Sequence, residues 1–133
     1  MKRSRKILLI IVLVFILLLF SCVAMVQKEM GKAIESVDKV ETVDISSVLD
    51  GTYMGKAETP LVKVEVSVTV KEGRLESIEL LRHDNGKGEK AEAMIEEMVR
   101  NNDSEVDLVS GATVSSICIR SAVRNALAQG IRK

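Results

Sequence analysis

The sequence predicts an α+β domain, with a small antiparallel sheet packed with helices, behind one N-terminal transmembrane helix. Three observations predict this fold class. The twenty residues 7–26 carry no charge. Valine fills every second position from Val62 to Val70, which is the period of a half-buried strand. Two later segments, 89–100 and 114–129, place apolar or small residues at helical spacing.

Residues 7–26 are the predicted transmembrane anchor. Twenty residues at helical rise cover roughly the 30 Å of a bilayer core. Residues 1–6 contain four basic and no acidic side chains. The positive-inside rule therefore predicts that residues 1–6 form a cytoplasmic tail and that the rest of the chain is extracytoplasmic.

The apolar segment has two other interpretations. A cleaved signal peptide has a shorter apolar stretch of about 7–15 residues and a small-residue cleavage site, which this segment lacks. A lipoprotein signal ending at Cys22 remains an alternative, because Leu19 and Ser21 precede the cysteine as such a signal requires. Against it, Phe20 is bulky and the apolar run continues to Val26. Both the anchor and the lipid predict a membrane-bound protein.

The net charge of the residues after the anchor, 27–133, which we call the body of the protein, indicates which partners it can bind. The whole chain has 19 basic and 19 acidic residues. With the four basic residues of the tail set aside, residues 27–133 carry 15 against 19, a net charge of −4. A mildly acidic body argues against a nucleic-acid partner. His83 is the single histidine and the cysteines Cys22 and Cys118 are far apart, so neither a zinc site nor a disulfide framework is predicted.

The body divides into a juxtamembrane spacer, residues 27–46, and a folded domain, residues 47–133. The spacer has a partial helical stripe of apolar residues with charged flanks. The domain opens with a short strand at 51–57. The valine strand at 62–70 then turns through residues 71–74, where Gly73 can adopt a positive φ, and returns as a strand at 74–83 with Ile78 and Leu80 on one face.

Helices follow the hairpin. After a Gly/Asn loop at 84–90, a helix is predicted at 89–100, and its buried stripe consists of Ala91, Met94, Ile95, Met98 and Val99. Residues 101–103 end that helix. Residues 104–109 form a short strand or an extended arm, and the last helix runs over 114–129 and stops at Gly130.

The segment before the last helix, "DLVSGATVSS" at 107–116, carries the most informative chemistry. Its glycine and alanine leave room for a bulky group, and its hydroxyls stand where a helix N-terminus favours an anion. A phosphate or phosphoester suits this arrangement. On residue types alone, the same Ser and Thr residues are also ordinary N-caps of a helix.

The motif D-x-x-S-G-A-T-x-S, residues 107–115, resembles the signature of the FMN-binding domain family. That family includes flavin-carrying subunits of ion-pumping NADH or ferredoxin oxidoreductases and small membrane-anchored domains. Further features match in the same order: Asp-Gly-x-Tyr-x-Gly at 50–55, the valine hairpin at 62–78, His83 and the Gly/Lys loop at 86–88. The resemblance covers residues 50–129.

This resemblance implies FMN as the cofactor, joined as a phosphoester to Thr113 by a flavin transferase outside the cytoplasm. It implies that Ser110, Gly111 and Ala112 shape the approach to Thr113 and that Asp107 fixes the loop. Ser115 offers a further hydroxyl, Tyr53 is the one aromatic side chain after the anchor, and His83 is a possible flavin contact. No catalytic residues and no metal ligands are predicted.

The expected function is that of an electron carrier or a subunit of an oxidoreductase rather than of a self-contained enzyme, with a redox donor and acceptor that the sequence does not identify. Two alternatives stay open: a non-covalent FMN binder, and a non-redox extracytoplasmic binding or structural module.

Overall fold

The structure is a computed structural model that describes residues 2–84 and 88–131. Its elements run in the order α1 (Lys2–Asp38), η1 (Ile45–Ser47), β1 (Gly51–Glu58), β2 (Lys63–Lys71), β3 (Arg74–Asp84), η2 (Glu89–Glu92), α2 (Ala93–Asn101) and α3 (Thr113–Ala128). The chain forms two compact units, residues 1–32 and residues 33–133. The second unit is an antiparallel sheet packed with helices, so the predicted α+β class is confirmed.

Helix α1 contains the predicted anchor and continues well beyond it. Among the described residues, it is the one helix long and apolar enough to cross a membrane. Its first 31 residues lie in the first unit, and residues 33–38 belong to the second. Part of the predicted spacer lies in the core of the domain, because Val43 and Ile45 are buried there.

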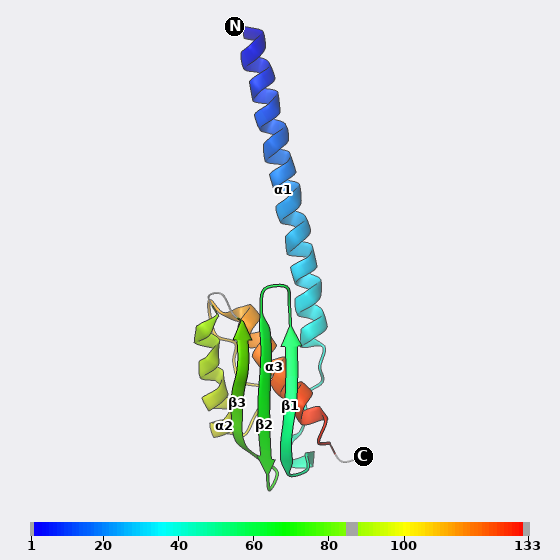
Figure 1. Ribbon diagram of the computed structural model, residues 1–133, viewed down its shortest axis with the longest axis vertical. Helices are drawn as coiled ribbons and strands as arrows, with labels where there is room; N and C mark the ends of the chain where they lie inside the picture. The colour runs from blue at the N-terminus through cyan, green and yellow to red at the C-terminus, as the bar shows by residue number, and fades with distance from the viewer. Residues whose placement is uncertain (1, 85–87, 132–133) are drawn as a thin grey trace. The chain divides into compact units, whose positions relative to one another are not determined.

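Within the described residues, the sheet has three strands in the order β1-β2-β3, all antiparallel (Figure 1). The alternation predicted for β2 is confirmed, since Val64, Val66, Val68 and Val70 are buried and their neighbours lie on the other face. The β2–β3 turn has positive φ at both Glu72 (52°) and Gly73 (71°), which is the backbone of the hairpin turns whose twist matches the strands.

Helix α3 covers one face of the sheet and contacts β1 and β2 (Figure 1). It runs antiparallel to β1. Asn125 donates to the carbonyl of Lys56 at 2.8 Å, and Gln129 donates to the carbonyl of Met54 at 2.5 Å. The crossing is close because the contact on β1 is Gly55, whose hydrogen leaves room for the backbone of Ala122.

The helix predicted at 89–100 begins with a 3₁₀ turn. Gly88 offers no side chain to cap the first turn, and short 3₁₀ turns are common at such helix ends. Helix α2 follows and buries Met94 and Met98. It ends as predicted, with Asn102 in the left-handed region at φ 53°. Residues 104–109 form an extended arm without a strand, and the predicted Gly/Lys loop falls largely on residues 85–87, outside the described residues.

Candidate functional site

A tight turn, residues 109–112, precedes α3. The amide of Ala112 donates to the carbonyl of Val109 at 3.0 Å. Gly111 has φ +80°, the value that a type II turn requires at its third residue. A Cβ built on Gly111 meets no heavy atom within 4 Å. The backbone conformation therefore calls for glycine, and the space in front of the turn is open.

Thr113 is the first residue of α3, and it is exposed. The N-cap residue is Ala112, and no side chain of the described residues caps the helix. The hydroxyls that could have served as N-caps therefore do not do so. The first N–H groups of a helix have no partner within it, and those of α3 receive no capping bond from a side chain in the described part of the protein.

A residue that the sequence did not single out holds this turn together. The Ser116 hydroxyl accepts a hydrogen bond from the Val109 amide at 3.0 Å and donates to the Ala112 carbonyl at 2.8 Å. Its side chain is fully buried. Ser116 was visible in the sequence as one of four hydroxyls, but its partners depend on how the turn folds back.

The structure brings most of the predicted loop residues together. Ser110, Gly111 and Thr113 are exposed, whereas Ala112 and Ser115 are buried. Asp107 is exposed, and among the described residues it makes no hydrogen bond to the turn. The turn is held by Ser116.

His83 lies near the end of β3 with its side chain only 3% exposed. Its Nδ1 lies 2.8 Å from a carboxylate oxygen of Glu92 in η2, and η2 packs against α3. The end of β3 and the first turn of α3 lie at the same end of the sheet (Figure 1). His83 is therefore in the part of the domain that carries the turn.

Tyr53 is at the other end of α3. Its hydroxyl donates to the Leu49 carbonyl at 2.9 Å, and its ring lies so close to Gly130 that a Cβ there would be 2.4 Å from Cζ. A 16-residue helix is about 24 Å long, which separates this ring from Thr113. The structure does not bring Tyr53 to the turn, and its contacts are those of a packed strand residue.

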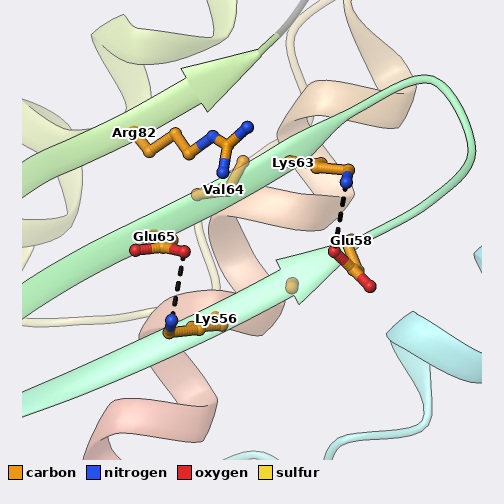
Figure 2. A pocket seen from close by; sticks show the side chains of 7 residues that line it. Lys56, Glu58, Lys63, Val64, Glu65 and Arg82 are labelled. Carbon is orange, nitrogen blue, oxygen red and sulfur yellow. Dashed lines mark hydrogen bonds and ion pairs between the residues drawn. The ribbon is translucent and has the colours of Figure 1, made fainter.

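A separate cavity of about 370 Å³ lies on the face of the sheet away from α3 (Figure 2). Its charged side chains pair with one another. Lys56 bonds to Glu65 at 3.1 Å, Lys63 lies 3.9 Å from Glu58, and Arg82 pairs with Asp84 just outside the lining. No residue of the 107–116 segment lines it. Because each cation there has an anionic neighbour, the cavity offers no surplus charge to an anionic ligand.

The arm that leads into the turn is held by Glu105. The Arg124 guanidinium, 7% exposed, binds both oxygens of this carboxylate, with Nε 2.6 Å from one of them. Arg124 also donates to the Val40 carbonyl at 3.0 Å and lies 3.5 Å from Asp38. One side chain of α3 thus joins the arm to the segment that follows α1.

We expect this contact to make stability depend on acid pH. The hydrogen bonds from Arg124 hold the pKa of Glu105 below its ordinary value. An acid with a lowered folded pKa adds stability that is present above its unfolded pKa, about 4.3, and is lost as pH falls through the folded value. Glu105→Gln should lower the free energy of unfolding by about 1–2 kcal/mol at neutral pH, and the difference from wild type should shrink below about pH 4.

Thermal unfolding of the full chain in detergent, followed across this pH range, checks the expectation. Glu96→Gln serves as the matched control, because Glu96 is exposed on α2. A constant gap between wild type and Glu105→Gln at all pH values would contradict the role given to the Glu105 charge.

The turn fits the phosphate end of FMN. A phosphate carries negative charge and several acceptor oxygens, and a helix N-terminus offers N–H donors and a partial positive charge. Here Ala112 provides no capping side chain for the N–H groups, Thr113 is exposed at the first helical position, and Gly111 leaves the approach open. These residues could hold the phosphate, and FMN itself would supply the redox chemistry.

Comparison with known proteins agrees with this fit. The sequence model of a family described as the FMN-binding domain matches residues 61–128. The match runs from the β1–β2 loop to the last residue of α3 and contains the whole turn. No curated protein matches the chain. The chain therefore belongs to the FMN-binding domain family, and its cofactor is FMN.

Proposed function

We propose that this protein is a membrane-anchored, extracytoplasmic electron-transfer domain whose FMN is attached covalently to Thr113 through a phosphoester. The observation that carries the proposal is the position of Thr113. Thr113 is exposed and is the first residue of α3, beside an uncapped helix N-terminus and an open glycine turn. A phosphodiester formed there keeps one negative charge, which the helix N-terminus stabilises.

The attachment is a group transfer that needs a partner enzyme. The Thr113 oxygen forms a bond to the flavin phosphorus and gives up its proton. The phosphorus in turn breaks its bond to a leaving group. Joining free FMN to a hydroxyl would release water and is unfavourable in water, so the donor must carry an activated phosphoanhydride. A flavin dinucleotide, with AMP as the leaving group, meets this requirement. A flavin transferase would supply the catalysis, because the turn contains no general base of its own.

The flavin ring is proposed to stay exposed. Tyr53 is the one aromatic side chain after the anchor, and it packs against Gly130 at the far end of α3. No aromatic side chain is thus available beside the turn to cover the ring. Exposure suits direct electron exchange with a donor protein and an acceptor protein, which are the partners that we propose.

The proposed placement follows the charges around the anchor. Residues 7–26 would span the bilayer, residues 1–6 would lie in the cytoplasm, and residues 27–46 would connect the span to the FMN-binding domain at 47–133. The uncharged length of the segment and the four basic residues before it support this placement. Lipidation of Cys22, which is exposed on α1, is the alternative means of membrane attachment.

One experiment tests both the covalent attachment of FMN and the anchoring of the protein in the membrane. The full chain is produced with a flavin transferase, membranes are isolated, and a denaturing gel is viewed under ultraviolet light before the intact mass is measured. The proposal predicts a fluorescent band in the membrane fraction and a mass gain of FMN less one water. Cys22→Ala should leave the band in the membrane if α1 is the anchor. Flavin that is lost on denaturation would instead indicate non-covalent FMN.

A further inference from the structure

We infer that Ser116 is a positioning residue for flavin attachment, an inference that rests on the function proposed above. Ser116 does not face the open side of the turn, since its side chain is fully buried. It acts through the backbone on either side of Gly111. The same hydroxyl accepts from the Val109 amide at 3.0 Å and donates to the Ala112 carbonyl at 2.8 Å.

These two bonds differ in kind. A serine hydroxyl that donates to the carbonyl four residues earlier is common in helices, and the Ser116 amide binds that same Ala112 carbonyl at 2.9 Å. The bond from Val109 is the unusual one. It crosses from the end of the arm to the first turn of α3, seven residues later. Ser116 therefore ties together the two backbone segments between which the turn is formed.

No other side chain of the described residues performs this task. Ala112 stands at the N-cap position, where a polar residue would ordinarily fix the start of a helix. Asp107 is exposed and makes no hydrogen bond to the turn in the described part of the chain. The Ala112 amide donates to the Val109 carbonyl and closes the turn. The Ser116 hydroxyl is hydrogen-bonded to the backbone of both residues.

The attachment reaction is sensitive to such positioning. The Thr113 oxygen must meet the flavin phosphorus in line with the leaving group, and a misplacement of about 1 Å can lower a rate by about a hundredfold. Thr113 follows Ala112 directly, so a change in the Ala112 backbone moves the acceptor hydroxyl. Loss of the Ser116 hydroxyl frees the Val109 amide and loosens the turn, while Ser110, Gly111 and Thr113 keep their own chemistry.

Ser116→Ala is the direct test, and Ser121→Ala is its matched control. Ser121 is also fully buried in α3 and also donates one hydrogen bond, to the Val37 carbonyl at 2.5 Å. The same atom is removed in both variants, but Ser121 lies away from the turn. Ser116→Cys fills the space of the serine with a weaker donor and acceptor, and it serves if the alanine variant does not fold.

The purified full chain is incubated with flavin transferase and flavin dinucleotide, and intact mass follows the modification over time. We expect Ser116→Ala to lower kcat by about tenfold or more with KM for the acceptor domain within about twofold, because the exposed side chains are unchanged. Ser116→Cys should fall between alanine and wild type. Ser121→Ala should stay within about twofold of wild type at a temperature where all variants are folded.

Hydrogen exchange gives a readout that does not depend on flavin. In Ser116→Ala the amides of Val109 and Ala112, which are hydrogen-bonded in the wild type, should exchange about tenfold faster or more, whereas Ser121→Ala should leave them unchanged. Equal modification rates or equal exchange in the two alanine variants would overturn the positioning role. A wild-type chain that gains no flavin would overturn the proposed function instead, and the exchange result would still decide whether Ser116 fixes the turn.

Discussion

Thr113→Ala abolishes the covalent flavin in this account. The variant should give no fluorescent band and no mass gain after production with a flavin transferase, while its thermal unfolding stays close to that of wild type. Thr113 is exposed at the start of α3, so removing its side chain leaves no cavity and breaks no hydrogen bond within the described residues. The loss should be complete, because the atom that is removed is the one that forms the bond to phosphorus.

The neighbouring hydroxyls do not substitute for Thr113. Ser115 is 2% exposed. The Ser116 hydroxyl is hydrogen-bonded to the Val109 amide and the Ala112 carbonyl. Ser110 is exposed, but it lies in the turn three residues ahead of Thr113 and outside α3.

Two further variants serve as controls for Thr113→Ala. Thr113→Ser should keep the band because it keeps the hydroxyl, and Thr42→Ala should keep it because Thr42 is an exposed residue outside the site. A band of wild-type intensity in Thr113→Ala would show that the flavin is attached elsewhere.

Gly55→Ala should strongly destabilise the domain. A Cβ at this position would lie 1.8 Å from the Ala122 carbonyl oxygen and 2.8 Å from the Ala126 amide nitrogen. Both are helix backbone atoms, which cannot move aside as a flexible side chain can. Helix α3 would have to lift from β1, and the bonds from Asn125 and Gln129 to that strand would be strained.

Overpacking of a core costs about 1–3 kcal/mol when side chains can adjust, and here we expect about 3 kcal/mol or more because they cannot. For a domain of this size, that corresponds to a fall in melting temperature of about 12 °C or more. Gly31→Ala is the matched control. A Cβ there meets nothing within 4 Å, so this helical position should be unchanged or stabilised by up to about 1 kcal/mol. If Gly55→Ala melted within about 2 °C of wild type, the packing described for α3 on β1 would be wrong.

The local elements of this fold are predictable from the sequence because their signals are local. The valine alternation of β2 follows from the two-residue period of a strand, and the end of α2 follows from Asn102, a residue type that tolerates left-handed backbone. The 3₁₀ start at Glu89 was less predictable, since helical spacing over one turn does not separate the two helix types.

Contacts between segments that are distant in the sequence could not be predicted from local patterns. Nothing local indicates that Arg124 would be buried and bonded to Glu105 and to the Val40 carbonyl. The burial of Val43 and Ile45 likewise depends on where the chain returns after α1. The sequence pattern alone therefore does not indicate that these two residues pack into the core.

In the candidate site, too, the local features could be predicted from the sequence and the contacts between segments could not. The glycine, the threonine and the helix that follows were predicted from the order of residues 107–116, whereas the exposure of Thr113 comes from the structure. The role of Ser116 was not, because a helix-facing hydroxyl has many possible partners until the turn is placed. Tyr53 was a candidate flavin contact as the one aromatic residue after the anchor, but its position beside Gly130 is set by the antiparallel course of α3 along β1.

Peptide mapping of the flavin-labelled full chain by tandem mass spectrometry identifies the residue that carries the flavin. We expect one modified peptide, carrying FMN less one water on the Thr113 side chain. An unmodified Thr113 peptide from a protein that carries flavin, or the same mass on a different residue, would contradict it.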